Sequence, residues 1–126
     1  MFTINKANAQ KRERNSLTSF FMLDKRTAMQ TELAVTWVVV KPGGRQILHH
    51  HEPEQVYVIV QGIGEMQVGA EKQVVRTGDL VYIPSKFEHG IVNTGDDKLV
   101  YVSAATPPFD LTEAYDRGQL ESENYN

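Results

Sequence analysis

Short apolar segments joined by tight turns make up the middle of this 126-residue chain. The segments are rich in β-branched and aromatic residues, as in 33–40 (L-A-V-T-W-V-V-V) and 55–61 (Q-V-Y-V-I-V-Q), which are both apolar on two faces. Glycine, proline or aspartate stands between most segments and the next. Many short strands at regular spacing are typical of an antiparallel sandwich or barrel, so the sequence predicts an all-β fold.

We expect one domain, because a chain of this length buries roughly two thirds of its unfolded surface without crosslinks. Along the sequence this domain is expected to have three parts. Residues 1–30 are expected to form a solvated N-terminal arm and a first strand, and residues 33–104 the barrel. Residues 106–126 form an acidic extension, with a short helix predicted at about 111–117. The predicted strands are 19–23, 33–40, 45–51, 55–61, 65–68, 73–76, 80–83, 89–93 and 98–104.

The composition argues against several classes of protein. The net charge of −3 provides no basic field for nucleic acid. The chain has no cysteine, which excludes disulfides and thiolate chemistry. No apolar run is long enough to cross a bilayer, and the N-terminus lacks the apolar stretch of a signal peptide. We therefore expect a cytoplasmic protein that binds neither nucleic acid nor membranes.

The histidines of the chain form a candidate metal site. Side chains alternate along a strand, so His49 and His51 point to one face and His50 to the other. Two imidazoles roughly 6.5 Å apart along a strand can lean together and share one metal ion. Gln55 has the same parity, and His89 lies in a second strand-like segment. If the fold brings these segments together, the site contains three imidazoles and one amide.

The segment around the first three histidines resembles the first motif of the cupin family, G-x5-H-x-H-x3,4-E-x6-G. Gly43, His49, His51 and Gly62 match it, and Gln55 stands where glutamate is usual. The resemblance extends over residues 33–104, which is most of the chain.

The segment around the fourth histidine resembles the second cupin motif, G-x5-P-x-G-x2-H-x3-N. Gly78, Pro84, His89 and Asn93 match it, and Lys86 stands where glycine is usual. The turn after Pro84 is therefore expected to differ from that of the family. Its lysine would either face an anionic substrate or remain solvated.

The resemblance implies a jelly-roll β-barrel, also called a double-stranded β-helix, with a divalent metal held in its mouth. It implies His49, His51 and His89 as ligands, and a homodimer in which N-terminal strands pack on the neighbouring subunit. Three histidines with open positions suit zinc, nickel, manganese, copper or iron, and their spacing does not choose among them. Gln55 is either a fourth ligand or a residue that orients an imidazole. As a neutral ligand it would leave the ion its full charge, which favours Lewis-acid chemistry.

The resemblance also implies a small-molecule enzyme. Small cupins include isomerases, lyases and cyclases, and some that process unsaturated uronates are similar in having a glutamine ligand. In such an enzyme the metal would hold a hydroxyl and a carbonyl of a sugar acid during a non-redox proton transfer. Candidates for the acid or base are Tyr57, Lys86 and Asp110. Tyr57, Ile59 and Met66 have the parity to line an apolar pocket.

Two alternatives to this enzyme remain open. One is an Fe(II)-dependent dioxygenase, which binds both O₂ and substrate at the metal. The other is a non-catalytic cupin that only binds a small molecule. Because one fold supports many functions, the sequence leaves the choice among these three to the site itself.

Overall fold

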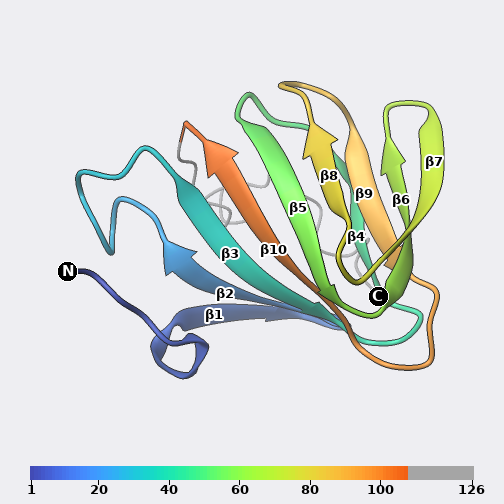
Figure 1. The fold of residues 1–126 in the computed structure, drawn as a ribbon, viewed down its shortest axis with the longest axis horizontal. Coiled ribbons are helices and arrows are strands. Elements are labelled where there is room, and N and C mark those ends of the chain that lie inside the picture. Colours follow the sequence, from blue (N-terminus) through green and yellow to red (C-terminus); the bar gives the residue numbers. More distant parts are fainter. Residues whose placement is uncertain (108–126) are drawn as a thin grey trace.

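The computed structural model describes residues 1–107, which form two antiparallel β-sheets. The larger sheet has six strands in the order β1-β2-β3-β10-β5-β8, and they lie side by side in Figure 1. Their bounds are Gln10–Arg14 (β1), Leu17–Leu23 (β2), Ala34–Val40 (β3), Leu99–Thr106 (β10), Glu54–Gln61 (β5) and Leu80–Ile83 (β8).

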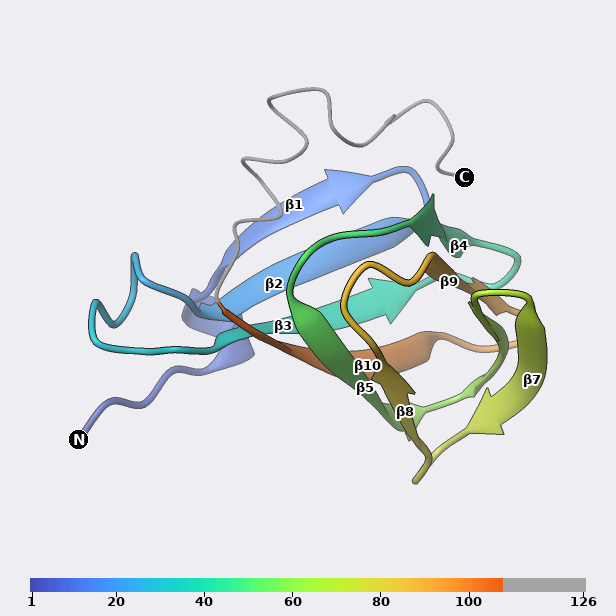
Figure 2. The same ribbon diagram turned by 90° about the horizontal axis from the view of Figure 1, so that it is seen from above.

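The smaller sheet has four strands in the order β4-β9-β6-β7. Their bounds are Arg45–His49 (β4), His89–Asn93 (β9), Ile63–Val68 (β6) and Glu71–Arg76 (β7). The two sheets face each other around a common interior (Figure 2). This arrangement confirms the all-β prediction and is consistent with a jelly roll, although the two sheets are not joined into a closed barrel.

Every second side chain of the strands points into the space between the sheets. Tyr57 and Ile59 of β5 and Met66 of β6 are at most 3% exposed, as their parity predicted. Together with the rest of the core cluster they form the packed interior that supports the site. The other members are Leu17, Val38, Val40, Val75, Ile83, Ile91, Leu99 and Tyr101.

The N-terminal segment differs from the predicted solvated arm. Residues 1–16 are not simply a solvated arm, because β1 pairs with β2 along its whole length and a 3-10 turn spans Lys6–Asn8. The sequence did not indicate this edge strand, because its residues Q-K-R-E-R are polar or charged and show no apolar alternation. Most of its side chains are exposed. The helix predicted at 111–117 lies outside the described residues. Within residues 1–107, no helix has the length and apolar character needed to cross a bilayer.

The turns of the two motifs explain why glycine is favoured there. Gly62, between β5 and β6, has φ +93°, and a Cβ at this position would lie 2.6 Å from the carbonyl oxygen of Lys98. Only glycine fits both the conformation and the space. Lys86, which stands where the second motif has glycine, also has a positive φ of 70°. Its backbone N–H donates to the carbonyl of His51, 2.8 Å away, so this strained turn is tied to the histidine segment.

Replacing Lys86 by glycine is therefore expected to stabilise the protein. A left-handed conformation costs a non-glycine residue on the order of 1 kcal/mol, and the exposed ion pair of Lys86 with Glu52, at 3.8 Å, offsets little of this. We expect the Lys86→Gly variant to gain about 0.5 to 1 kcal/mol in urea unfolding. Lys86→Ala, which removes the same ion pair but keeps the Cβ, is the matched control and should show no gain. Equal stabilities of the two variants would contradict the strain argument.

Candidate metal centre

Two histidines face each other across neighbouring strands. His49 is the last residue of β4, His89 is the first of β9, and the antiparallel register makes them direct partners. The register shifts between Gln46 and His49, so these two residues point to the same side although they are three positions apart. His51 follows in the bend before β5, and Gln55 is the second residue of β5. The fold thus brings together all four residues that the motifs indicated.

The three imidazoles form a compact cluster. Their ring centroids are 4.3 Å apart for His49 and His89, 5.0 Å for His51 and His89, and 5.5 Å for His49 and His51. One nitrogen of each ring lies within 4.8 Å of those of the other two. Since metal–nitrogen bonds are about 2.1 Å long, small side-chain adjustments suffice for one ion to contact all three rings.

Backbone carbonyls fix the orientation of every ring. The Nδ1 atoms of His49, His51 and His89 lie 2.8, 2.8 and 3.0 Å from the carbonyl oxygens of Ile47, Pro53 and Phe87. A carbonyl only accepts, so each Nδ1 carries the proton and each Nε2 keeps its lone pair. The Nε2 of His89 is buried and has no hydrogen-bond partner. Three oriented imidazoles, one with an unmatched buried lone pair, fit a divalent transition metal.

Burial keeps these rings neutral. Removal from water lowers the pKa of His49 to about 3, and the neighbouring His89 adds to this effect. Burial also lowers the pKa of His89 to about 4 and lowers the pKa of His51. A neutral imidazole is the form that binds a metal, so the cluster is ready for a cation at neutral pH.

Gln55 connects the cluster to the larger sheet. Its Oε1 lies 2.9 Å from the Nε2 of His51, and its Nε2 donates to the Oγ of Ser103 on β10. An imidazole nitrogen and an amide oxygen are both atoms that ligate divalent metals, and here they lie side by side. A cation bound at this point would contact both atoms.

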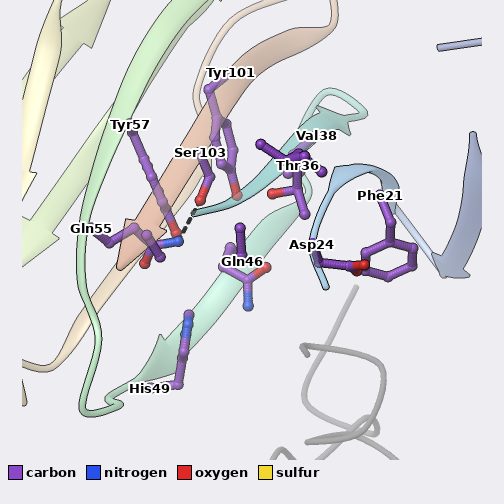
Figure 3. Close-up of a pocket in the computed structure, with 13 residues that line it drawn as sticks. Phe21, Asp24, Thr36, Val38, Gln46, His49, Gln55, Tyr57, Tyr101 and Ser103 are labelled. Atoms are coloured by element: carbon purple, nitrogen blue, oxygen red, sulfur yellow. Dashed lines mark hydrogen bonds between the residues drawn. The ribbon is translucent and has the colours of Figure 1, made fainter. Parts of the chain in front are cut away.

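A small cavity lies beside this cluster. Figure 3 shows Gln55, Tyr57, Tyr101 and Ser103 projecting from β5 and β10 toward the side chains of β4. The free space is about 30 Å³, room for about two water molecules, so a sugar-sized ligand requires wall side chains to move. The lining residues are Phe21, Leu23, Asp24, Ala34, Thr36, Val38, Gln46, His49, Gln55, Tyr57, Tyr101, Ser103 and Ala105.

The three candidates for an acid or base have different placements. Tyr57 lines the cavity, stacks on Tyr101 at 4.2 Å and meets the His89 ring edge-on at 6.0 Å. Lys86 lies on a surface turn, where its ammonium group points to Glu52 at 3.8 Å, and it is not among the lining residues. Asp110 lies outside the described residues. Of the two candidates within residues 1–107, Tyr57 is the one that lies next to the cluster.

Several polar residues of the cavity were not anticipated. Gln46 and Ser103 are 4% exposed, and Asp24 is 7% exposed, with its carboxylate accepting three hydrogen bonds from Arg26. Gln46 was missed because the irregularity in β4 reverses its parity relative to His49. Ser103 was missed because β10 carries no motif, and Asp24 because it lies in the bend after β2, also outside the motifs. The only available signal was a polar residue within an apolar segment.

Comparison with known proteins agrees with the motifs. The family model described as "Cupin domain" matches residues 36–105. An uncharacterized protein of Methanocaldococcus jannaschii is 38% identical over 72 residues, which cover 56% of this chain and 58% of that protein. The match thus spans a little over half the length of that relative.

Solved structures share the fold at low sequence identity. A predicted oxalate decarboxylase from Thermotoga maritima has a TM-score of 0.76 at 20% identity and covers 84% of this chain and 99% of its own. KdgF from Halomonas sp. has a TM-score of 0.74 at 22% identity, with 87% and 97% covered. Ectoine synthase from P. lautus has a TM-score of 0.78 at 15% identity, with 93% and 86% covered.

Proposed function

The chain belongs to the cupin family, whose model matches more than half of its length, and on this premise we propose that it is a metal-dependent enzyme. The proposed reaction is a non-redox isomerisation, elimination or cyclisation of a small oxygenated molecule such as a sugar acid. The structural relatives include proteins named as a sugar phosphate isomerase and an ectoine synthase, whose names denote chemistry of this kind.

The observation that carries this proposal is the unmatched Nε2 of His89, buried at the meeting point of three oriented imidazoles. A buried nitrogen without a partner costs about 1 to 3 kcal/mol, which a bound cation would recover. The position next to a cavity with polar walls favours a reactive centre over a purely structural one. A bound divalent ion would supply Lewis-acid polarisation of a substrate oxygen there.

We assign Gln55 as the fourth ligand of this centre. Its amide oxygen already lies 2.9 Å from the Nε2 of His51, as two ligands of one ion would. The other three ligands are also neutral, so the protein would not reduce the charge of the ion. This charge would make an ionised substrate oxygen or carboxylate the natural binding group, which supports the choice of sugar acids.

Tyr57 is the proposed acid or base among the described residues. Its ring is 2% exposed and held between Tyr101 and the edge of His89. A proton donor or acceptor must lie within hydrogen-bond reach of the reacting atom. Tyr57 satisfies this for a substrate that occupies the cavity next to Gln55. Lys86 and Asp110 remain alternative candidates without such placement.

The test of the proposed function is metal-dependent turnover. The purified protein is stripped with chelator, reloaded separately with Ni²⁺, Zn²⁺, Mn²⁺ or Fe²⁺, and incubated with enolisable sugar acids. We expect turnover with a redox-inert ion such as Zn²⁺, and its loss in Tyr57→Phe with metal content unchanged. Activity only with Fe²⁺ and O₂ would identify the dioxygenase instead. Full metal loading without any turnover would favour the non-catalytic cupin that only binds a small molecule.

We also propose that two copies of this chain associate through the outer face of the larger sheet. Strand β5 is apolar on both faces, but the single chain leaves part of its outer face exposed. Val58 and Val60 of β5 and Leu80 and Tyr82 of β8 remain 37%, 38%, 61% and 54% exposed. They form a continuous apolar area on neighbouring strands, and such an area on a small domain indicates an association surface. A second copy presents the same apolar face and is the proposed occupant.

This dimer is expected to dissociate when charge enters the outer face. The variant Val58→Lys with Leu80→Lys should sediment as a 14.2 kDa monomer at concentrations where the wild type is a dimer. Val74→Lys, on a 48% exposed residue of β7 in the other sheet, is the matched control and should remain dimeric. A wild type that is monomeric at high micromolar concentration would overturn the proposal.

A further inference from the structure

His51 differs from the other two histidines of the cluster in how its position is fixed. His49 ends β4 and His89 begins β9, so the pairing of these strands places both residues. His51 belongs to neither sheet and lies in the loop 50–53 between β4 and β5. Its backbone is therefore held in place by contacts other than strand pairing, and these contacts decide whether its ring stays beside the other two.

The contacts come from the turn 84–88 between β8 and β9. This turn and the loop 50–53 lie side by side at one end of the two sheets, as Figure 1 and Figure 2 both show. The backbone N–H of Lys86 donates to the carbonyl oxygen of His51 at 2.8 Å. The hydroxyl of Ser85 donates to the carbonyl oxygen of the next residue, Glu52. Two consecutive peptide groups of the loop are thus bound by two consecutive residues of the turn.

We infer that Ser85 is a positioning residue for His51. This inference rests on the proposed metal centre, in which His51 is a ligand. A carbonyl oxygen only accepts hydrogen bonds, so the direction of the contact is fixed and the Ser85 hydroxyl is the donor. The contact holds the peptide group that lies between His51 and the carbonyl of Pro53, which orients the His51 ring at 2.8 Å from its Nδ1.

The same turn also orients the ring of His89. The carbonyl oxygen of Phe87 lies 3.0 Å from the Nδ1 of His89, and the N–H of Phe87 donates back to the carbonyl of Pro84 at 3.2 Å. One short segment therefore carries the partner of one ring and the two donors that hold the loop of the other. It fixes the separation of the two rings, whose centroids are 5.0 Å apart.

The first test removes the hydroxyl of Ser85. Because Ser85 is exposed and water competes for its partner, we expect Ser85→Ala to weaken Zn²⁺ binding about 3- to 10-fold, measured by competition with a chromophoric chelator. Ser85→Thr keeps the hydroxyl and should retain most of the affinity. Tyr82→Phe is the matched control, because it removes another exposed hydrogen bond, from the Tyr82 hydroxyl to the Glu54 carboxylate, between the same two parts of the chain. It should leave the affinity unchanged.

A double-mutant cycle shows whether Ser85 acts through His51. In the His51→Ala background, Ser85→Ala should cause no further loss of Zn²⁺ affinity, because no ring remains to be positioned. In the His49→Ala background the same change should still weaken binding about 3- to 10-fold, since His51 is still present. A general effect on the fold would weaken binding in both backgrounds.

The metal-free protein gives a readout that does not depend on the ion. The amide proton of Lys86 is bonded to the His51 carbonyl, so its hydrogen exchange reports how often the loop and the turn separate. Exchange at Lys86 should be faster in Ser85→Ala than in the wild type or in Tyr82→Phe.

The outcomes separate this inference from the proposed function. Wild-type Zn²⁺ affinity in Ser85→Ala, or equal losses in the His51→Ala and His49→Ala backgrounds, would overturn the role of Ser85 and leave the metal centre intact. An unchanged exchange rate at Lys86 would overturn it as well. If the wild type binds no Zn²⁺, the metal centre and the inference both fail.

Discussion

His89→Ala is expected to weaken metal binding by roughly two to three orders of magnitude. Metal sites with four protein ligands have binding free energies on the order of 10 to 16 kcal/mol, so one ligand contributes roughly 3 to 4 kcal/mol. The loss of His89 should therefore weaken binding about 100- to 1,000-fold. The effect is large because His89 is fully buried and its Nε2 has no other partner. Elemental analysis of purified protein and Zn²⁺ competition titration measure it.

The matched control for this variant is His50→Ala. His50 is adjacent to two of the proposed ligands but is exposed and absent from the cluster. It should retain wild-type metal content. Far-UV circular dichroism of both variants excludes unfolding as the cause. Wild-type Zn²⁺ affinity in His89→Ala, or equal losses in the two variants, would refute the proposed centre.

Local rules predicted the parts of this protein that depend on alternation within one strand. Tyr57, Ile59 and Met66 are buried because each points inward from an uninterrupted strand, as its parity required. His49 and His51 came together with Gln55 for a related reason, since the bend at Pro53 did not separate them. The presence of glycine at motif position 62 also has a local explanation, because a positive φ and the nearby carbonyl of Lys98 leave no room for a side chain.

Other features depended on information that no single strand contains. The irregularity in β4 places Gln46 and His49 on one side, which an ideal strand would not do. Ser103 reaches Gln55 through the register of β5 and β10, which depends on packing across the whole sheet. The edge strand β1 was hidden because its charged side chains follow no apolar pattern. The sequence indicated where strands form, but it did not indicate which strands pair or in which register.

The same burial that suits the histidines for metal binding should make the metal-free protein sensitive to acid. The pKa of His49 is lowered to about 3 by burial and by His89, and that of His89 to about 4 by burial. In the unfolded chain both would titrate near 6.5. Between these values the unfolded state binds more protons than the native state, so stability falls as the pH decreases. The stabilisation is complete above about pH 6.5 and declines below it.

Chelator-treated protein is expected to lose roughly 3 kcal/mol of unfolding free energy between pH 6.5 and 5 through His49 and His89, because the contribution of each rises to about 1.4 kcal/mol per pH unit as the pH falls below 6.5. Carboxylates contribute little in this window: burial alone would raise the pKa of Asp24, but hydrogen bonds from Arg26 lower it overall, so its effect comes at lower pH. Urea unfolding at fixed protein concentration across this range measures the slope. In His89→Ala the slope should be shallower, since one depressed group is gone. A stability that is flat from pH 7 to 5 would mean that these imidazoles accept protons in the folded protein, and the cluster would then not hold the neutral rings that a metal requires.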